Sequence, residues 1–169
     1  MRTPILIAGS VCCVFLSAQP ASLRVDLARI GQIAPKGRVQ DKYYNPDLPV
    51  VAKLIEAGPK SIPFLISKLE DKTPVKGHVM DFWPDVRVGD VAWIILCDFF
   101  TTADWEHSTI SPGLGSIIED QKLPSQDAWA AQLRKDGRAG IRKKVEKILS
   151  PYQGRLFWDA KERCFRVRD

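Results

Sequence analysis

The strongest constraint on the fold is a pair of apolar stripes with helical spacing, one on each side of the dipeptide Gly58-Pro59. The first stripe is Val51, Leu54 and Ile55, and the second is Ile62, Leu65, Ile66 and Leu69. Gly58 supplies a left-handed residue at a helix end, and Pro59 prevents the helix from continuing. The pattern therefore predicts two short helices joined by a tight turn, an αα-hairpin over residues 47–71.

Residues 48–74 (LPVVAKLIEAGPKSIPFLISKLEDKTP) resemble a HEAT-type helical repeat. The resemblance rests on the two stripes, the turn between them and the closing Asp71. A partial second copy begins at residue 85 with Asp-Val-Arg, but Asp90 stands where the family has a small residue, and residues 75–84 interrupt the period. The resemblance implies paired helices that stack side by side and bind other proteins. Three or more repeats are usually needed for a solenoid, so no long array is expected.

The remaining pattern predicts a mainly α fold. Residues 88–100 (VGDVAWIILCDFF) are apolar on almost every side, which is typical of a buried central helix that is too short to cross a bilayer. Residues 101–124 read as an irregular connection. Two basic helices are expected over residues 125–150, with a break at Gly137 or Gly140. Residues 155–168 change to a period of two, which predicts a small C-terminal β-hairpin.

The first 18 residues have the charged, apolar and cleavable order of a secretory signal, with cleavage expected after Ala18. Residues 19–169 would then form one exported domain, periplasmic or secreted, with no stable membrane span. Cys97 and Cys164 are the cysteines of that mature chain. They are a candidate disulfide in an oxidising compartment, or alternatively Cys97 is a small buried hydrophobe. They lack nearby Cys or His partners, so no metal or cofactor is expected.

Positive charge is concentrated in the last part of the chain. Residues 133–169 contain twelve Lys or Arg against five Asp or Glu, whereas residues 19–132 contain twelve against fifteen. The candidate binding cations on the basic helices are Arg134, Arg138, Arg142, Lys143, Lys144 and Lys147. Arg163, Arg166 and Arg168 add further cations on the hairpin, where Arg binds carboxylate or phosphate bidentately. The alternative is an ordinary solvated helix face.

These cations suit another protein or an anionic envelope component. Nucleic acid is not expected, because aromatic residues are not interleaved with the cations. The aromatic residues Phe82, Trp83 and Trp105 are candidate contact residues on loops, because exposed Trp commonly anchors interfaces. Alternatively, they fold back as a lid on the core.

A catalytic alternative uses the two histidines of the chain. His78 and His107, with Asp81 and Asp85, could hold a hydrolytic metal across two loops. No HExxH, GxSxG or phosphate-loop motif is present. The sequence therefore favours an exported, non-catalytic interaction or scaffold module, with a small metal-assisted hydrolase as the alternative.

Overall fold

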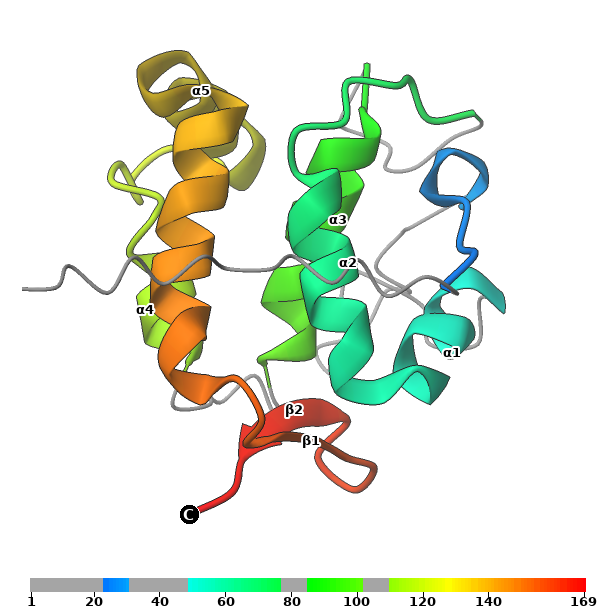
Figure 1. The fold of residues 1–169 in the computed structure, drawn as a ribbon. Helices are drawn as coiled ribbons and strands as arrows, with labels where there is room; N and C mark the ends of the chain where they lie inside the picture. The colour runs from blue at the N-terminus through cyan, green and yellow to red at the C-terminus, as the bar shows by residue number, and fades with distance from the viewer. Residues whose placement is uncertain (1–22, 31–48, 77–84, 102–109) are drawn as a thin grey trace, which may run out of the picture.

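The structure is a computed structural model that describes residues 23–30, 49–76, 85–101 and 110–169. It is mainly helical, with a two-stranded antiparallel sheet at the C-terminus, as the sequence predicts. The elements, shown in Figure 1, are η1 (Leu27–Arg29), α1 (Pro49–Glu56), η2 (Gly58–Lys60), α2 (Ser61–Lys68), α3 (Val88–Phe99), α4 (Ser111–Gly115), α5 (Ser125–Leu149), η3 (Ser150–Tyr152), β1 (Leu156–Asp159) and β2 (Cys164–Val167).

The two short helices α1 and α2 are joined by η2. Gly58 has φ +59°, the left-handed conformation expected at this position. Ser61 is the first residue of α2, and its hydroxyl donates to the Gly58 carbonyl at 2.7 Å. Both predicted helices are therefore present, whereas their membership of a HEAT-type repeat stays a prediction.

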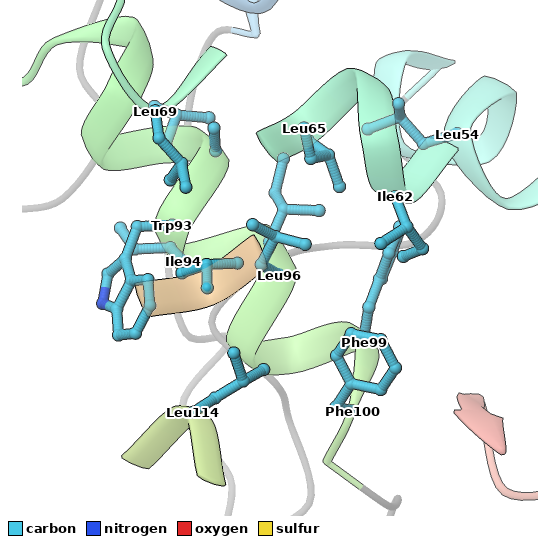
Figure 2. Packing of buried hydrophobic residues seen from close by; sticks show 14 of the residues in the cluster. Leu54, Ile62, Leu65, Leu69, Trp93, Ile94, Leu96, Phe99, Phe100 and Leu114 are labelled. Atoms are coloured by element: carbon cyan, nitrogen blue, oxygen red, sulfur yellow. The ribbon is translucent and has the colours of Figure 1, made fainter. Parts of the chain in front are cut away.

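Helix α3 forms the centre of the molecule, because all but one of its residues are buried. Figure 1 shows α3 behind α2, and Figure 2 shows Ile62 and Leu65 of α2 directed toward Leu96 and Phe99 of α3. The helix is apolar almost all round, so it can pack against neighbours on every side. The sequence prediction of a buried central helix is confirmed.

Part of the stretch predicted as an irregular connection is ordered by packing. Helix α4 lies within it, and Ile110, Leu114 and Ile117 are buried. Pro112 is tolerated because the first turn of a helix has no partner for its missing N–H. A Cβ on Gly113 would lie 3.1 Å from Ile148 Cγ2, so a glycine permits α4 to approach α5 closely.

Helix α5 is two helical segments joined at Gly137. This residue has φ 65° and ψ 166°, a non-helical conformation that favours glycine. The break therefore falls at the first of the two glycines that the sequence suggests. The second segment buries Ile141, Val145 and Leu149 against the core.

The C-terminal hairpin packs against the end of α3 through aromatic rings. Strands β1 and β2 pair antiparallel, with Trp158 opposite Phe165. Phe99 contacts Trp158 and Phe165 edge to face, with ring centroids 5.6 and 5.4 Å apart. The hairpin is thus attached to the helical core rather than isolated, which a two-stranded sheet needs for stability.

Within the part of the chain that the structure describes, no helix is both long enough and apolar enough to span a membrane. The predicted signal, residues 1–18, lies outside the described residues.

Candidate functional site on the basic helix α5

The six candidate cations of α5 fall into three groups. Arg138 is largely enclosed in an internal ion pair, two others bridge acidic side chains at the surface, and the remaining three are exposed. The sequence pattern alone does not distinguish among the six, because it does not show which acidic side chains lie near each of them.

The buried Asp90 and the partly buried Arg138 form an ion pair between α3 and α5. Arg138 Nη2 donates to Asp90 Oδ1 at 2.7 Å, and the two side chains are only 13% and 6% exposed. Trp129 Nε1 donates to the same oxygen at 2.8 Å, and its ring stacks on Trp93 with centroids 4.9 Å apart. Arg138 is therefore largely enclosed and already paired with a carboxylate, and its role as a binding residue stays a prediction.

The other carboxylate oxygen of Asp90 organises the start of α3. Asp90 Oδ2 accepts from the Arg87 backbone N–H at 2.8 Å, which satisfies a donor that precedes the helix. Arg138 Nη1 donates to the Leu69 carbonyl at 3.3 Å and so reaches the end of α2. A buried charge is stable only when it is paired and hydrogen-bonded, and these contacts meet that need.

Arg142 and Lys144 are held by acidic side chains. Arg142 donates to Glu70 at 3.0 Å and to Glu146 at 2.8 Å, so it links α5 to the end of α2. Both carboxylates raise the pKa of Arg142, and the hydrogen bond to Glu146 has the larger effect. Lys144 contacts Asp136 across the break in α5 at 2.5 Å.

Asp136 and Glu119 complete a surface network around the break. Glu119 contacts Lys135 before the break and lies 3.5 Å from Lys144 after it. The hydrogen bond from Lys144 is the main reason that the pKa of Asp136 is lowered, and the hydrogen bond from Lys135 has the same role for Glu119. The network therefore connects the two segments of α5 and leaves Lys144 unavailable as an open binding cation.

Arg134, Lys143 and Lys147 are the exposed cations of α5. Among the described residues, no carboxylate forms an ion pair with any of the three. Lys143 and Lys147 are four residues apart in the second segment, so they lie on the same face of that helix. We call these two residues the lysine row. Arg134 lies before the break, on the first segment.

All but one of the loop candidates fall in parts of the chain that the structure does not describe. His78, His107, Asp81, Phe82, Trp83 and Trp105 lie outside the described residues. Asp85 is described: it is exposed and has φ 58°, a left-handed conformation that few residues other than glycine adopt but that Asp adopts more readily than most. Within the described ranges, no group of three His, Cys, Asp or Glu side chains is arranged to hold a metal ion.

Cys97 and Cys164 are not joined by a disulfide in the structure, where both are thiols. Cys97 lies in α3 and Cys164 begins β2. Desolvation by the surrounding protein, with a smaller effect of the Asp98 charge, raises the pKa of the Cys97 thiol. A thiol with a raised pKa is a poor nucleophile, and the structure is consistent with the packing alternative for Cys97.

Comparison of the chain with protein-family models, with curated proteins and with solved structures gives no match.

Proposed function

We propose that this protein is an exported, non-catalytic interaction module, and that the lysine row on α5 contacts an acidic partner protein. The observation that carries the proposal is the division among the cations of α5. The neighbouring cations Arg138, Arg142 and Lys144 are neutralised within the chain, whereas Lys143 and Lys147 remain exposed.

The packing of α5 supports this use of its surface. Ile141, Val145 and Leu149 are buried on the opposite side of the same segment, so the backbone that holds the lysine row is fixed against the core. Two like charges on a fixed helix face present a constant pattern to a carboxylate-rich partner. Such complementarity increases the rate and specificity of association.

The decisive experiment measures partner capture from an envelope extract at low and high salt, followed by affinity measurement with each partner purified. The test variant is Lys143→Glu/Lys147→Glu. The matched control is Lys72→Glu/Lys122→Glu, which changes the net charge equally at two exposed lysines outside α5. We expect the test variant to weaken binding at least about tenfold, with the control close to wild type.

Salt provides the second criterion, because exposed ion pairs are screened as ionic strength rises. We expect the affinity of the wild type to fall with salt, and the affinity of the test variant to change little. If the affinity falls equally in the test variant and the control, binding depends on net charge and not on the position of the lysines, which contradicts the proposal. A partner whose binding is unaffected by the test variant would refute the lysine row as its contact surface.

The hydrolase alternative depends on His78, His107 and Asp81, which lie outside the described residues, together with Asp85. No observation in the described part of the chain favours it, and it stays a prediction. The roles of Phe82, Trp83 and Trp105 in binding likewise stay predictions.

A further inference from the structure

A second basic surface lies at the open end of the C-terminal hairpin. The strand register continues from Leu156 opposite Val167, and the Arg168 N–H donates to the Arg155 carbonyl at 2.9 Å. Arg155 and Arg168 are therefore directly opposite one another, and their side chains project from the same face. Like charges in this relation destabilise a hairpin unless an anion lies between them.

Each guanidinium of this arginine pair is placed over an aromatic ring. Arg155 lies 5.8 Å from the centroid of Tyr152, and Arg168 lies 5.6 Å from the centroid of Phe157. Stacking leaves the N–H groups at the edges of a guanidinium available as donors. Arg155 uses one of them for the Pro151 carbonyl, at 3.3 Å. Both side chains are exposed, and among the described residues neither forms an ion pair with a carboxylate.

Arg166, the next arginine on this face, is different. It lies 3.3 Å from Asp159 and is already neutralised. On this face of the hairpin, Arg166 is therefore paired with a carboxylate, whereas Arg155 and Arg168 have none among the described residues, which concentrates the anion-binding potential at these two.

We propose that Arg155 and Arg168 together bind a phosphate dianion, either free phosphate or a phosphate monoester. The charge of the anion matches the two guanidiniums. A monoester has three strongly accepting oxygens, enough to bridge two guanidiniums, whereas the two oxygens of one carboxylate are used by a single bidentate contact. This site goes beyond the proposed function, because it uses a different element and different residues from the lysine row.

The test is a calorimetric titration of the full chain with inorganic phosphate, phenyl phosphate and acetate at fixed ionic strength. The variants are Arg155→Gln and Arg168→Gln, singly and together, and the control is Lys161→Gln, an exposed cation in the turn of the same hairpin. We expect saturable phosphate binding in the wild type and the control. Each single variant should weaken it about tenfold or more, and acetate should bind at least about tenfold more weakly than phosphate.

The two phosphate probes distinguish the sources of the anion. Equal affinity assigns the site to free phosphate, and tighter binding of phenyl phosphate assigns it to a monoester. Absence of saturation, equal loss in Lys161→Gln, or acetate binding as tightly as phosphate would each overturn the proposal.

Thermal unfolding gives an independent readout that confirms folding of each variant. In phosphate-free buffer, Arg155→Gln should have a Tm close to that of the wild type, because it removes a like-charge repulsion together with the exposed contacts to Tyr152 and Pro151. Phosphate should raise the Tm of the wild type and the control but not that of the double variant. A phosphate-induced rise of the same size in all proteins would contradict a site at these arginines.

Discussion

At the scale of single residues, Asp90 withdraws one cation of α5, Arg138, from the surface. Its carboxylate accepts from Trp129, from Arg138 and from the Arg87 backbone, and so joins α3 to α5 while it orders the start of α3. Arg138 also reaches the carbonyl at Leu69. A buried pair of this kind contributes little net stability against an apolar replacement, but it is costly to break.

Replacing Arg138 with Met should therefore be strongly destabilising. The substitution leaves the Asp90 charge buried with only neutral donors, at a cost of about 3–5 kcal/mol. Urea unfolding followed by Trp fluorescence measures the change. Arg134→Met is the matched control, and its effect should stay within about 0.5 kcal/mol because Arg134 is exposed.

A double-mutant cycle with Asp90→Asn tests whether the two residues act together. The double variant Asp90→Asn/Arg138→Met should lose less than the sum of the two single losses, because the second substitution removes a charge that the first has left unpaired. If Arg138→Met were as stable as wild type, the assignment of Arg138 to the interior would be wrong.

The contact between Arg138 and the Leu69 carbonyl leaves room only for a glycine at position 89. A Cβ at this position would lie 2.3 Å from Arg138 Nη1 and 2.4 Å from the Leu69 carbonyl oxygen. The carbonyl belongs to the backbone and cannot move aside cheaply, so Gly89→Ala should cost about 1–3 kcal/mol in unfolding free energy. Gly115→Ala, where the added methyl meets open space, should be neutral or slightly stabilising in the same urea titration.

At the scale of elements, the break in α5 separates the two segments that hold the basic residues. Gly137 provides the conformation of the break, and Lys144 and Glu119 link the segments across it. The second segment can therefore turn its apolar stripe to the core while the first positions Trp129 beside α3.

Replacing Gly137 with Ala tests this conformation. With φ 65° and ψ 166°, the residue lies in a region that is essentially restricted to glycine, and strain of this kind costs about 1–3 kcal/mol. We expect a lower urea midpoint for Gly137→Ala, with Gly115→Ala again as the control. If the urea midpoint were unchanged, the glycine-specific conformation at Gly137 would not be needed for the stability of α5.

The turn of the hairpin should be sensitive to acid through Asp159. The pKa of this carboxyl is lowered, mainly because the Glu162 backbone N–H donates to it, with Arg166 adding to the effect. A lowered folded pKa means that the ionised carboxylate stabilises the folded turn above its unfolded pKa of 3.8, and that this stabilisation is lost as the pH falls through the folded value.

Amide hydrogen exchange at Lys161 and Glu162 measures this effect, because both amides donate to Asp159. Their protection, corrected for the intrinsic pH dependence of exchange, should decrease below about pH 4 in the wild type. Asp159→Asn keeps an accepting oxygen but does not titrate, so its protection should vary less with pH. The same pH profile in both proteins would contradict a role for the Asp159 charge.

At the scale of the whole molecule, the buried helix α3 organises the fold and the C-terminal part of the chain supplies the basic surface. Neighbours on several sides cover α3: α2, α4 and β2 pack against it, and Trp129 of α5 contacts Trp93 and Asp90. The lysine row lies on α5 and the arginine pair lies at the open end of the hairpin, so both proposed basic surfaces belong to the C-terminal elements. The C-terminal elements therefore both complete the core around α3 and present charge on their outer faces.

The proposed export of the chain makes a prediction at this scale. In cells that export it, the mature protein should begin at Gln19, because small residues are preferred immediately before a signal cleavage site. Mass spectrometry of the N-terminal peptide checks the position. Ala18→Arg should block processing, whereas Ala21→Arg, beyond the site, should not. A mature protein that keeps Met1 would refute a cleaved signal.

Local patterns in the sequence were sufficient for most elements. The spacing of Leu54, Leu65 and Leu69, the left-handed Gly58 and the all-round apolar α3 follow from helix periodicity and turn chemistry. Helix α4 could not be predicted in this way, because its burial depends on contact with segments far away in the chain. The pairing of Arg138 with Asp90 was inaccessible for the same reason.

The sequence by itself determined the mainly α fold, the break within the basic helices and the C-terminal hairpin, because these depend on neighbours a few residues apart. Only the tertiary structure decided which charges are available. It enclosed Arg138, bridged Arg142 and Lys144, and left the lysine row and the arginine pair exposed. The physical reason is that an ion pair depends on distance in space, and Asp90 and Arg138 meet only when α3 and α5 pack together.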